Sequence, residues 1–195
     1  MDTTPMIRRE TAHGVDYVRL EDELFQKREI ILTGGVDPQT MISLLKQLMY
    51  LNKTDPDKEI TLYINSPGGE VTSGLAVYDY MKMMKAPLRT VCVGTAASMG
   101  AILFLAGDKR EMFPRSKLMI HDPAPGGGTM AGMKPAEMEE QLHCLKKTQK
   151  ILCEIIAETT GKPLEDVQDK TCRDSFFDAE EAIAFGLATA ITESV

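Results

Sequence analysis

Three times between residues 30 and 106, a short aliphatic run is followed by signals for a helix. The runs begin near Ile30, Ile60 and Leu88, and glycine or proline closes each of them before the next segment starts. Alternation of strands and helices is typical of a parallel sheet whose strands are joined by right-handed helical crossovers. The sequence therefore predicts an α/β fold for most of the chain.

The helix after the first strand has a clear start. Asp37 suits the N-cap, and Pro38 suits the first helical position, where a backbone N–H has no helical partner in any case. An apolar stripe with helical spacing follows: Met41, Leu44, Leu45, Leu48 and Met49. These residues are expected to form one face of the helix.

Further elements are expected along the rest of the chain. Helices are predicted over 72–85, from Pro135 to about Thr160, and from Asp178, as N-cap, to a stop at Gly186. Strands are predicted in segments 24–32, 60–64, 88–93, 112–113, 117–121 and 188–191. Residues 122–132 are rich in glycine and proline and are expected to form a loop, and the polar residues 1–17 a mobile arm.

The stretch Val91–Gly100 reads as a strand, a tight turn and a helix start, with Ser98 at the turn. The first N–H groups of a helix lack partners and favour negative charge, so an oxyanion that develops beside Ser98 would be stabilised there. The alternative is that Ser98 only caps the helix. The stretch is not the G-x-S-x-G elbow of α/β-hydrolases, because position 96 is alanine.

A second stretch, Ile60–Gly69, is a strand with alternating apolar residues that ends in Ser-Pro-Gly-Gly. Because glycines let the backbone approach a ligand closely, Gly68 and Gly69 can offer N–H groups to an oxyanion or bind a peptide backbone. A plain turn is the alternative interpretation.

A serine nucleophile needs a base, and the base needs an orienting carboxylate. His13 lies in the polar arm and His143 in the long predicted helix, whereas His121 directly follows a predicted strand. Strand ends are where α/β active sites collect, so His121 is the candidate base. The carboxylate candidates are Asp166, Asp169, Asp174 and Asp178. Sequence physics does not choose among them, although Asp178 fits an N-cap better.

Composition narrows the classes of function. The formal net charge of −7 argues against nucleic-acid binding. No apolar run approaches the roughly 20 residues that span a bilayer, and the N-terminus lacks a signal-peptide pattern, so a cytoplasmic protein with no membrane contact is expected. The four cysteines contain no C-x-x-C pair, which predicts neither a zinc site nor a disulfide framework.

Four segments together resemble the ClpP family, the proteolytic subunits of the ATP-dependent Clp protease. They are 64–69, 96–100, 119–121 and 173–176, in the order and spacing of that family, and the resemblance runs from about Pro5 to Ile191. It implies an α/β fold of ClpP/crotonase-like repeated β-β-α units with a protruding handle helix. It also implies a single serine peptidase domain over 1–195, with residues 1–17 as an N-terminal axial arm and 122–160 as the Gly-rich loop and handle helix.

The resemblance further implies a serine endopeptidase with the catalytic residues Ser98, His121 and Asp174. The oxyanion donors would be the N–H groups of Gly69 and Met99, Gly68 and Gly69 would bind substrate, and Arg173 would link oligomer assembly to the triad. It implies a homo-oligomer of two stacked heptameric rings that cleaves unfolded polypeptides delivered by an AAA+ unfoldase of the ClpX, ClpA or ClpC type. That partner would use the ATP, and the chain itself would need no cofactor or metal.

Departures from the family pattern keep alternatives open. The turn at 108–113 is shorter than in many ClpP chains, and the loop at 122–133 is longer. Thr61 stands where the family often has an aromatic residue, and Glu21-Asp-Glu23 stands where a Ser-Arg pair is usual. The chain is therefore also compatible with a mixed ring beside a second ClpP subunit, or with a catalytically idle or regulatory subunit. A crotonase-type acyl-CoA enzyme would use the Gly68-Gly69 loop without needing the triad.

Overall fold

The computed structural model describes residues 4–12, 14–125 and 132–193. In chain order the elements are β1 (Met6–Thr11), β2 (Gly14–Arg19), α1 (Leu20–Gln26), β3 (Glu29–Val36), α2 (Pro38–Thr54), β4 (Ile60–Gly69), α3 (Val71–Met83), β5 (Leu88–Ala97), α4 (Met99–Leu105), β6 (Lys109–Met112), β7 (Lys117–Ile120), α5 (Pro135–Thr160), α6 (Leu164–Thr171), β8 (Ser175–Phe177), α7 (Ala179–Phe185) and β9 (Ala190–Ile191).

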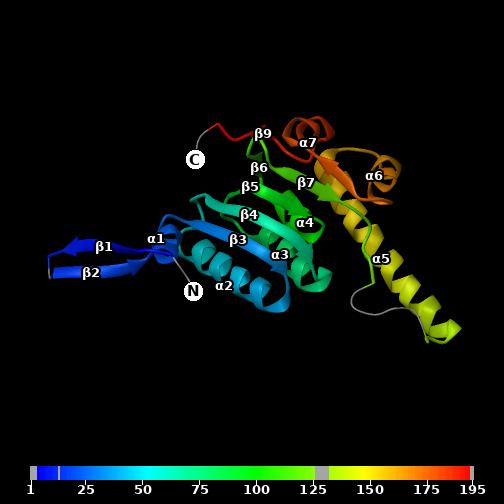
Figure 1. Cartoon of the computed structure of the whole chain (residues 1–195), viewed down its shortest axis with the longest axis horizontal. Coiled ribbons are helices and arrows are strands. Elements are labelled where there is room, and N and C mark those ends of the chain that lie inside the picture. The colour runs from blue at the N-terminus through cyan, green and yellow to red at the C-terminus, as the bar shows by residue number, and fades with distance from the viewer. Residues whose placement is uncertain (1–3, 13, 126–131, 194–195) are drawn as a thin grey trace.

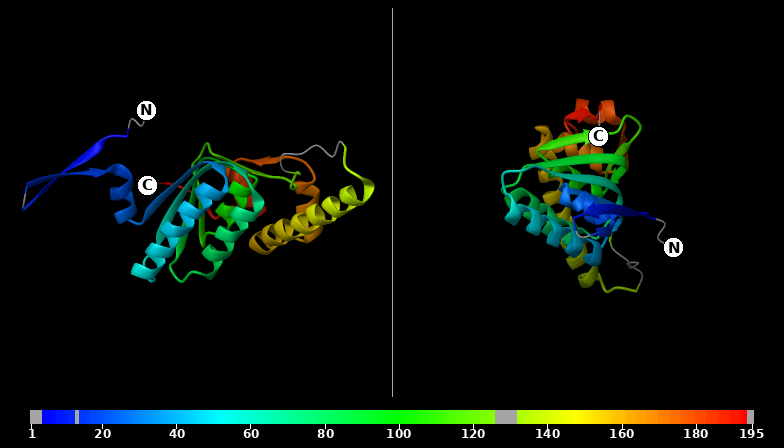
Figure 2. Two further views of the ribbon diagram at one scale, coloured as in Figure 1. Left: turned by 90° about the horizontal axis from the view of Figure 1, so that it is seen from below. Right: turned by 90° about the vertical axis from the view of Figure 1, so that its left-hand side faces the viewer.

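The central sheet has the strand order β3-β4-β5-β6-β9, and these strands are parallel. Strand β5 divides its pairing, because its first half pairs with β6 and its end pairs with β7. Strand β8 then pairs antiparallel with β7. Helices α2, α3 and α4 lie behind the sheet in Figure 1, and α2 and α3 lie together beneath it in Figure 2. The α/β fold with a parallel sheet is confirmed, and it is consistent with the ClpP fold.

Helix α2 begins where the sequence predicts. The Asp37 carboxylate accepts hydrogen bonds from the amides of Gln39 (2.8 Å) and Thr40 (3.0 Å), and the Thr40 hydroxyl accepts from the Asp37 amide. The Thr40 amide holds the pKa of the Asp37 carboxyl below its ordinary value. The stripe faces the core, with Met41, Leu44, Leu48 and Leu51 buried. Met49, at its edge, is 36% exposed.

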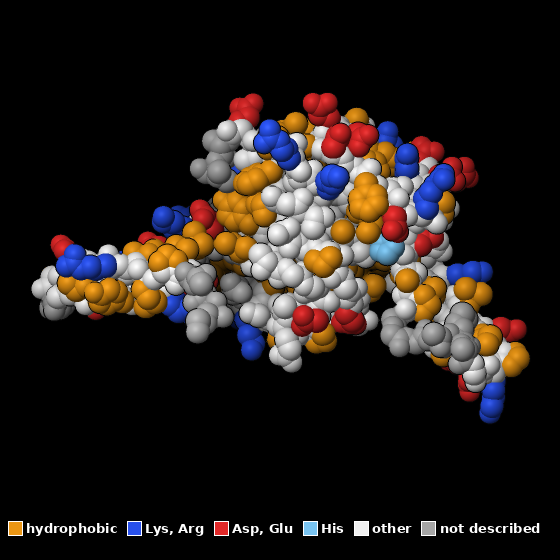
Figure 3. Space-filling view, in the orientation of Figure 1, with side chains coloured by type: hydrophobic (Ala, Val, Ile, Leu, Met, Phe, Trp, Pro, Cys, Tyr) orange, Lys and Arg blue, Asp and Glu red, His pale blue; other side chains and the backbone are white. Residues whose placement is uncertain are grey.

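The N-terminal region contains structure that the sequence pattern does not reveal. Strands β1 and β2 form an antiparallel hairpin that projects from the body (Figure 1). Apolar side chains lie along it in Figure 3, and Tyr17 is 65% exposed. The prediction of a strand from Leu24 was wrong at its start, because residues 24–26 belong to α1 and β3 begins at Glu29.

Helix α5 has the predicted bounds and points away from the sheet (Figure 1). Its second half is anchored through Leu152, Cys153, Ile155 and Ile156, which are buried, whereas Leu142 in its first half is 46% exposed. Residues 126–131 of the predicted Gly-rich loop lie outside the described residues. Helix α6 and strand β8 were not predicted, and α7 is capped by Asp178 as predicted.

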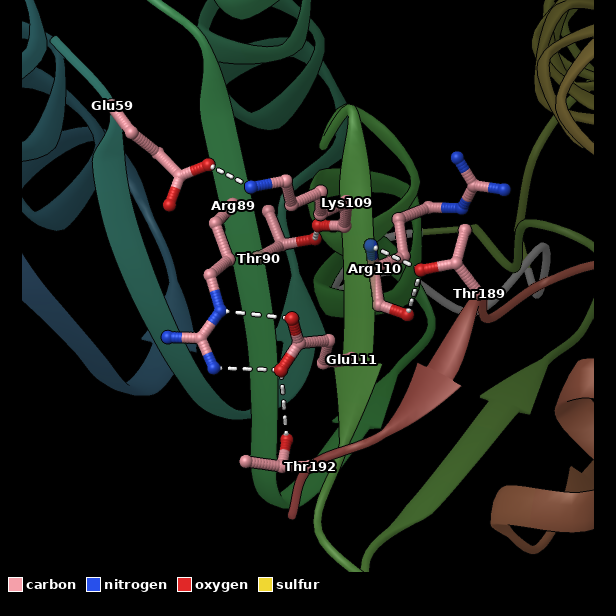
Figure 4. Close-up of polar contacts among 8 residues, drawn as sticks. All are labelled: Glu59, Arg89, Thr90, Lys109, Arg110, Glu111, Thr189 and Thr192. Carbon is pink, nitrogen blue, oxygen red and sulfur yellow. Dashed lines mark hydrogen bonds and ion pairs between the residues drawn. The ribbon is translucent and has the colours of Figure 1, made fainter. Parts of the chain in front are cut away.

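Side chains tie the far strands to the sheet (Figure 4). The Arg89 guanidinium on β5 donates two hydrogen bonds to the Glu111 carboxylate on β6, at 3.0 and 2.6 Å, and the Thr192 hydroxyl donates to the same carboxylate. The Thr189 hydroxyl accepts from the Arg110 amide at 2.9 Å and donates to the Arg110 carbonyl. The segment before β9 is therefore fixed to β6 by side chains as well as by the short strand ladder.

Candidate active site

Ser98 occupies a sharp corner between β5 and α4. Its φ of 53° and ψ of −122° lie in a region that residues other than glycine rarely adopt. The Ser98 amide donates to the Met119 carbonyl at 2.9 Å, which continues the β5–β7 ladder by one residue and fixes the corner. The side chain makes no cap hydrogen bond to α4. The alternative role of Ser98 as a plain N-cap therefore finds no support.

The glycine loop at the end of β4 lies directly against this corner. A β-carbon at Gly68, whose φ is +89°, would stand 2.6 Å from the Ala97 carbonyl oxygen and 2.7 Å from the Ser98 β-carbon. A β-carbon at Gly69 would stand 2.2 Å from the Val36 carbonyl oxygen. Only glycine allows this approach, so the loop and the serine corner form one packed unit.

Ser66 holds the glycine loop in place. Its hydroxyl donates to the Gly34 carbonyl at 2.7 Å and accepts from the Gly68 amide at 3.1 Å, and the residue is fully buried. Sequence analysis did not single out Ser66. The only sequence signal was a small polar residue directly before Pro-Gly-Gly.

His121 meets Ser98 from the end of β7. Its Nε2 lies 2.8 Å from the Ser98 Oγ, within hydrogen-bond reach. The histidine side chain is 26% exposed, so most of it is packed. Of the other histidines, His143 is exposed on α5, and His13 lies outside the described residues.

Asp174 reaches the other nitrogen of the same ring. In the antiparallel β7–β8 ladder Ile120 pairs with Ser175, so His121 and Asp174 are the next residues of the same register. The Asp174 Oδ1 lies 3.5 Å from the His121 Nδ1, which is an ion-pair distance slightly too long for a hydrogen bond. The Asp174 side chain is 63% exposed. The structure thus brings together the three side chains that the resemblance implied, and it uses Asp178 as a cap.

The remaining predicted site residues surround these three. Met99 is the first residue of α4, so its N–H is one of the helix amides that lack an intrahelical partner. Arg173 is exposed on the turn that precedes Asp174.

A groove of about 830 Å³ begins beside the glycine loop. Gly69, Glu70 and Val71 line one side of it, Pro123 lies at its edge two residues beyond His121, and Leu142 and Leu145 of α5 line the other side. The Ser73 side chain and amide hold the pKa of Glu70 below its ordinary value, so this wall of the groove carries a negative charge. The groove therefore lies beside the glycine loop that packs against Ser98.

Two further observations concern the described part of the chain. No group of three or more His, Cys, Asp or Glu side chains is arranged there to hold a metal ion. No helix in the described ranges is long and apolar enough to cross a membrane.

A serine, a histidine and an aspartate that meet at strand ends in this geometry are the arrangement of a serine hydrolase, here on an α/β fold. The comparison with known families narrows this class. A family model described as Clp protease matches residues 12–195. The chain therefore belongs to the Clp protease family, whose members are usually serine peptidases and typically act as oligomers with an ATPase partner.

Proposed function

We propose that this protein is the proteolytic subunit of an ATP-dependent Clp protease, a serine endopeptidase with Ser98, His121 and Asp174 as its triad. The observation that carries the proposal is the 2.8 Å contact between the Ser98 Oγ and the His121 Nε2, with Asp174 at the opposite ring nitrogen. A hydroxyl alone is a weak nucleophile at neutral pH, and this contact supplies its base.

The mechanism follows from the positions of these groups. His121 removes the hydroxyl proton as the Ser98 Oγ attacks a peptide carbonyl, and Asp174 stabilises the imidazolium that forms. The N–H groups of Gly69 and Met99 are assigned to the oxyanion, and loss of one such donor typically raises the barrier by about 2.7–4 kcal/mol. His121 then gives its proton to the leaving amine. Water, activated by the same imidazole, hydrolyses the acyl-enzyme.

The substrate class is an unfolded polypeptide. Gly69 lies in the lining of the groove, and glycine backbone in that position suits an extended chain rather than a folded surface. Gly68 is buried behind it, with its amide donating to Ser66, and is assigned to substrate binding because it shapes this loop. The apolar residues Val71, Leu142 and Leu145 suit the apolar side chains that an unfolded chain exposes. The reaction needs no cofactor or metal from this chain, and ATP is used by the partner.

The particle is assigned as two stacked heptameric rings of a single-domain chain in the cytoplasm, fed by an AAA+ unfoldase of the ClpX, ClpA or ClpC type. The exposed apolar residues Leu142 and Ile151 on α5 fit a contact between chains. The hairpin of β1 and β2 fits an axial arm that meets the ATPase. Arg173, exposed beside Asp174, is assigned to the contact between rings, so Arg173→Ala is expected to give smaller and less active rings in sedimentation and peptidase assays.

A second candidate is a catalytically idle or regulatory subunit of a mixed ring with a more typical ClpP chain. The 3.5 Å separation between the Asp174 Oδ1 and the His121 Nδ1 and the exposure of Asp174 favour it, because a poorly oriented imidazole is an inefficient general base. The crotonase-type alternative has no observation in its favour, since it leaves the meeting of the three triad side chains unused.

Reaction with a fluorophosphonate, followed by mapping of the adduct, tests the proposal. The assembled wild-type chain should be labelled at Ser98, and His121→Ala should abolish labelling. The matched control is His143→Ala, which removes an exposed histidine from α5 and should leave labelling unchanged. A well-assembled wild-type particle that is not labelled would support the idle subunit instead.

A further inference from the structure

Asp122, the residue after His121, combines two unusual features. Its Oδ2 accepts a hydrogen bond of 2.6 Å from the Gln149 side chain on α5. Its Oδ1 is buried with no hydrogen-bond partner, which is true of no other buried side-chain oxygen or nitrogen in the described residues. Buried polar atoms without partners destabilise a fold by about 1–3 kcal/mol, so stability alone does not account for an aspartate at this place.

The backbone of Asp122 restrains the segment that carries the triad carboxylate. Its amide donates to the Thr171 carbonyl at 2.7 Å, three residues before Asp174. On the other side of the pair, Ile120 lies opposite Ser175 in the β7–β8 ladder. The His121–Asp174 pair is therefore held between two backbone restraints, one on each side.

The same place connects to α5 a second time. Cys153, one helical turn after Gln149, has its Sγ 3.5 Å from the Thr171 Oγ1, and both residues are buried. We call Asp122, Gln149, Cys153 and Thr171 the Asp122 cluster. Helix α5, the end of α6 and the His121 segment all meet in this cluster, and the side chain of Asp122 is its link from α5 to His121.

We infer that Asp122 is a positioning residue for the triad, and that the Gln149–Asp122 hydrogen bond couples the position of α5 to the His121–Asp174 pair. The inference rests on the proposed peptidase function. Because Asp174 is exposed and 3.5 Å from the ring, its orientation depends on the restraints around it. A small displacement of a reacting group can lower a rate by about a hundredfold, so a shift of α5 would change the rate through this contact.

The test uses Gln149→Ala in the full chain, with Lys150→Ala as the matched control. Lys150 is the next residue on the same helix and its side chain is 69% exposed. With a small peptide substrate, Gln149→Ala should lower kcat roughly ten- to a hundredfold and change KM by less than about twofold. Lys150→Ala should leave both close to the wild-type values.

The split between kcat and KM supplies a readout that simple loosening of the fold would not give. Gln149→Ala should lower kcat while KM and the amount of assembled particle in sedimentation stay close to the wild-type values. Asp122→Asn keeps an oxygen that accepts from Gln149 and should retain most of the activity. Asp122→Ala should lower kcat as much as Gln149→Ala does. The double variant should be no less active than either single variant, because both changes remove the same hydrogen bond.

Three results would overturn the inference while leaving the proposed function in place. They are equal activity in Gln149→Ala and Lys150→Ala, a rise in KM with kcat unchanged, and a fall in kcat that only follows a loss of assembled particle. If the assembled wild type neither hydrolyses peptide nor reacts with a fluorophosphonate, both proposals fail. The wild type alone reveals that outcome, before any variant is made.

Discussion

The two sides of His121 are fixed very differently. On one side, Ser98 sits at a corner that the β5–β7 ladder, the buried start of α4 and the glycine loop hold from three directions. On the other side, Asp174 is 63% exposed and its carboxylate stands 3.5 Å from the ring. The contact between Ser98 and His121 is thus preformed, whereas the position of the Asp174 carboxylate depends on its surroundings.

This difference indicates where the site can be regulated. The serine corner is part of the core, so changing it means changing the fold. The Asp174 corner lies between α6 and β8 and is linked through Asp122 to α5, the helix that projects from the body. We therefore expect contacts made by α5 to act on the position of Asp174 rather than on the Ser98 corner.

The largest effect is expected from Gly68→Ala on the serine side. The new β-carbon would clash with backbone atoms of the corner at a φ of +89°, so activity should be lost and the free energy of unfolding should fall by several kcal/mol, more than the roughly 1–3 kcal/mol of backbone strain. Gly34→Ala is the matched control, because its φ is +83° and its β-carbon would meet nothing within 4 Å. Chemical denaturation and peptide hydrolysis measure both variants. Equal destabilisation of the two would contradict the close packing of loop and corner.

The next effect is expected from Asp174→Ala on the carboxylate side. Peptidase kcat should fall by roughly 10³–10⁴-fold because the imidazole loses its orienting partner, while stability should change little because the side chain is exposed. Asp169→Ala, another exposed aspartate of the same region, serves as the control. Wild-type activity in Asp174→Ala would show that this carboxylate does not orient His121.

Thiol labelling should show a smaller effect, and it compares directly how readily the serine side and the carboxylate side of His121 open. Cys144 and Cys172 are exposed, and Cys92 and Cys153 are buried; burial raises the pKa of both buried thiols. The exposed thiols should react at least roughly tenfold faster with a disulfide reagent at pH 8, because the thiolate is the reactive form. Cys153, on the α5 side, should then react faster than Cys92 of β5, since the carboxylate side opens more readily. Equal rates would mean that the two sides are equally rigid, and the opposite order would mean that the serine side opens more readily.

The smallest effect is expected at the far end of β5. The Arg89 guanidinium lowers the pKa of the Glu111 carboxyl, so this pair stabilises the fold at neutral pH, and the contribution is lost in acid as the carboxylate becomes protonated. Arg89→Met should lower the free energy of unfolding by about 1 kcal/mol at pH 7, and the difference from wild type should shrink in acid. Peptidase kcat should not change. A loss of stability that persists in acid would assign the effect to packing.

Local sequence signals predicted the helices whose first residues include a capping side chain or a proline. The Asp37-Pro38 start, the Pro135 start and the Asp178 cap were all read from sequence, because each places a cap or a proline beside an apolar stripe. The hairpin and α1 were missed because Val15 and Tyr17 stay exposed and α1 has no side-chain cap. Helix α6 and strand β8 depend on packing against α5 and β7, which no local pattern encodes.

For the candidate site, sequence physics selected Ser98 and His121, and the resemblance was needed to select Asp174. That choice depends on strand register, because Asp174 faces His121 only once Ser175 pairs with Ile120. Asp122 and Ser66 gave no signal, since the role of each follows from contacts with residues distant in sequence: Gln149 in one case, Gly34 in the other.

The positive φ of Ser98 has a consequence for which nucleophiles this corner admits. A β-branched side chain is disfavoured where the backbone turns in the left-handed sense, so threonine would strain the corner although it carries the same hydroxyl. Cysteine has a single γ atom and could occupy the position. The geometry of the main chain thus restricts the choice of reactive atom before any substrate is bound.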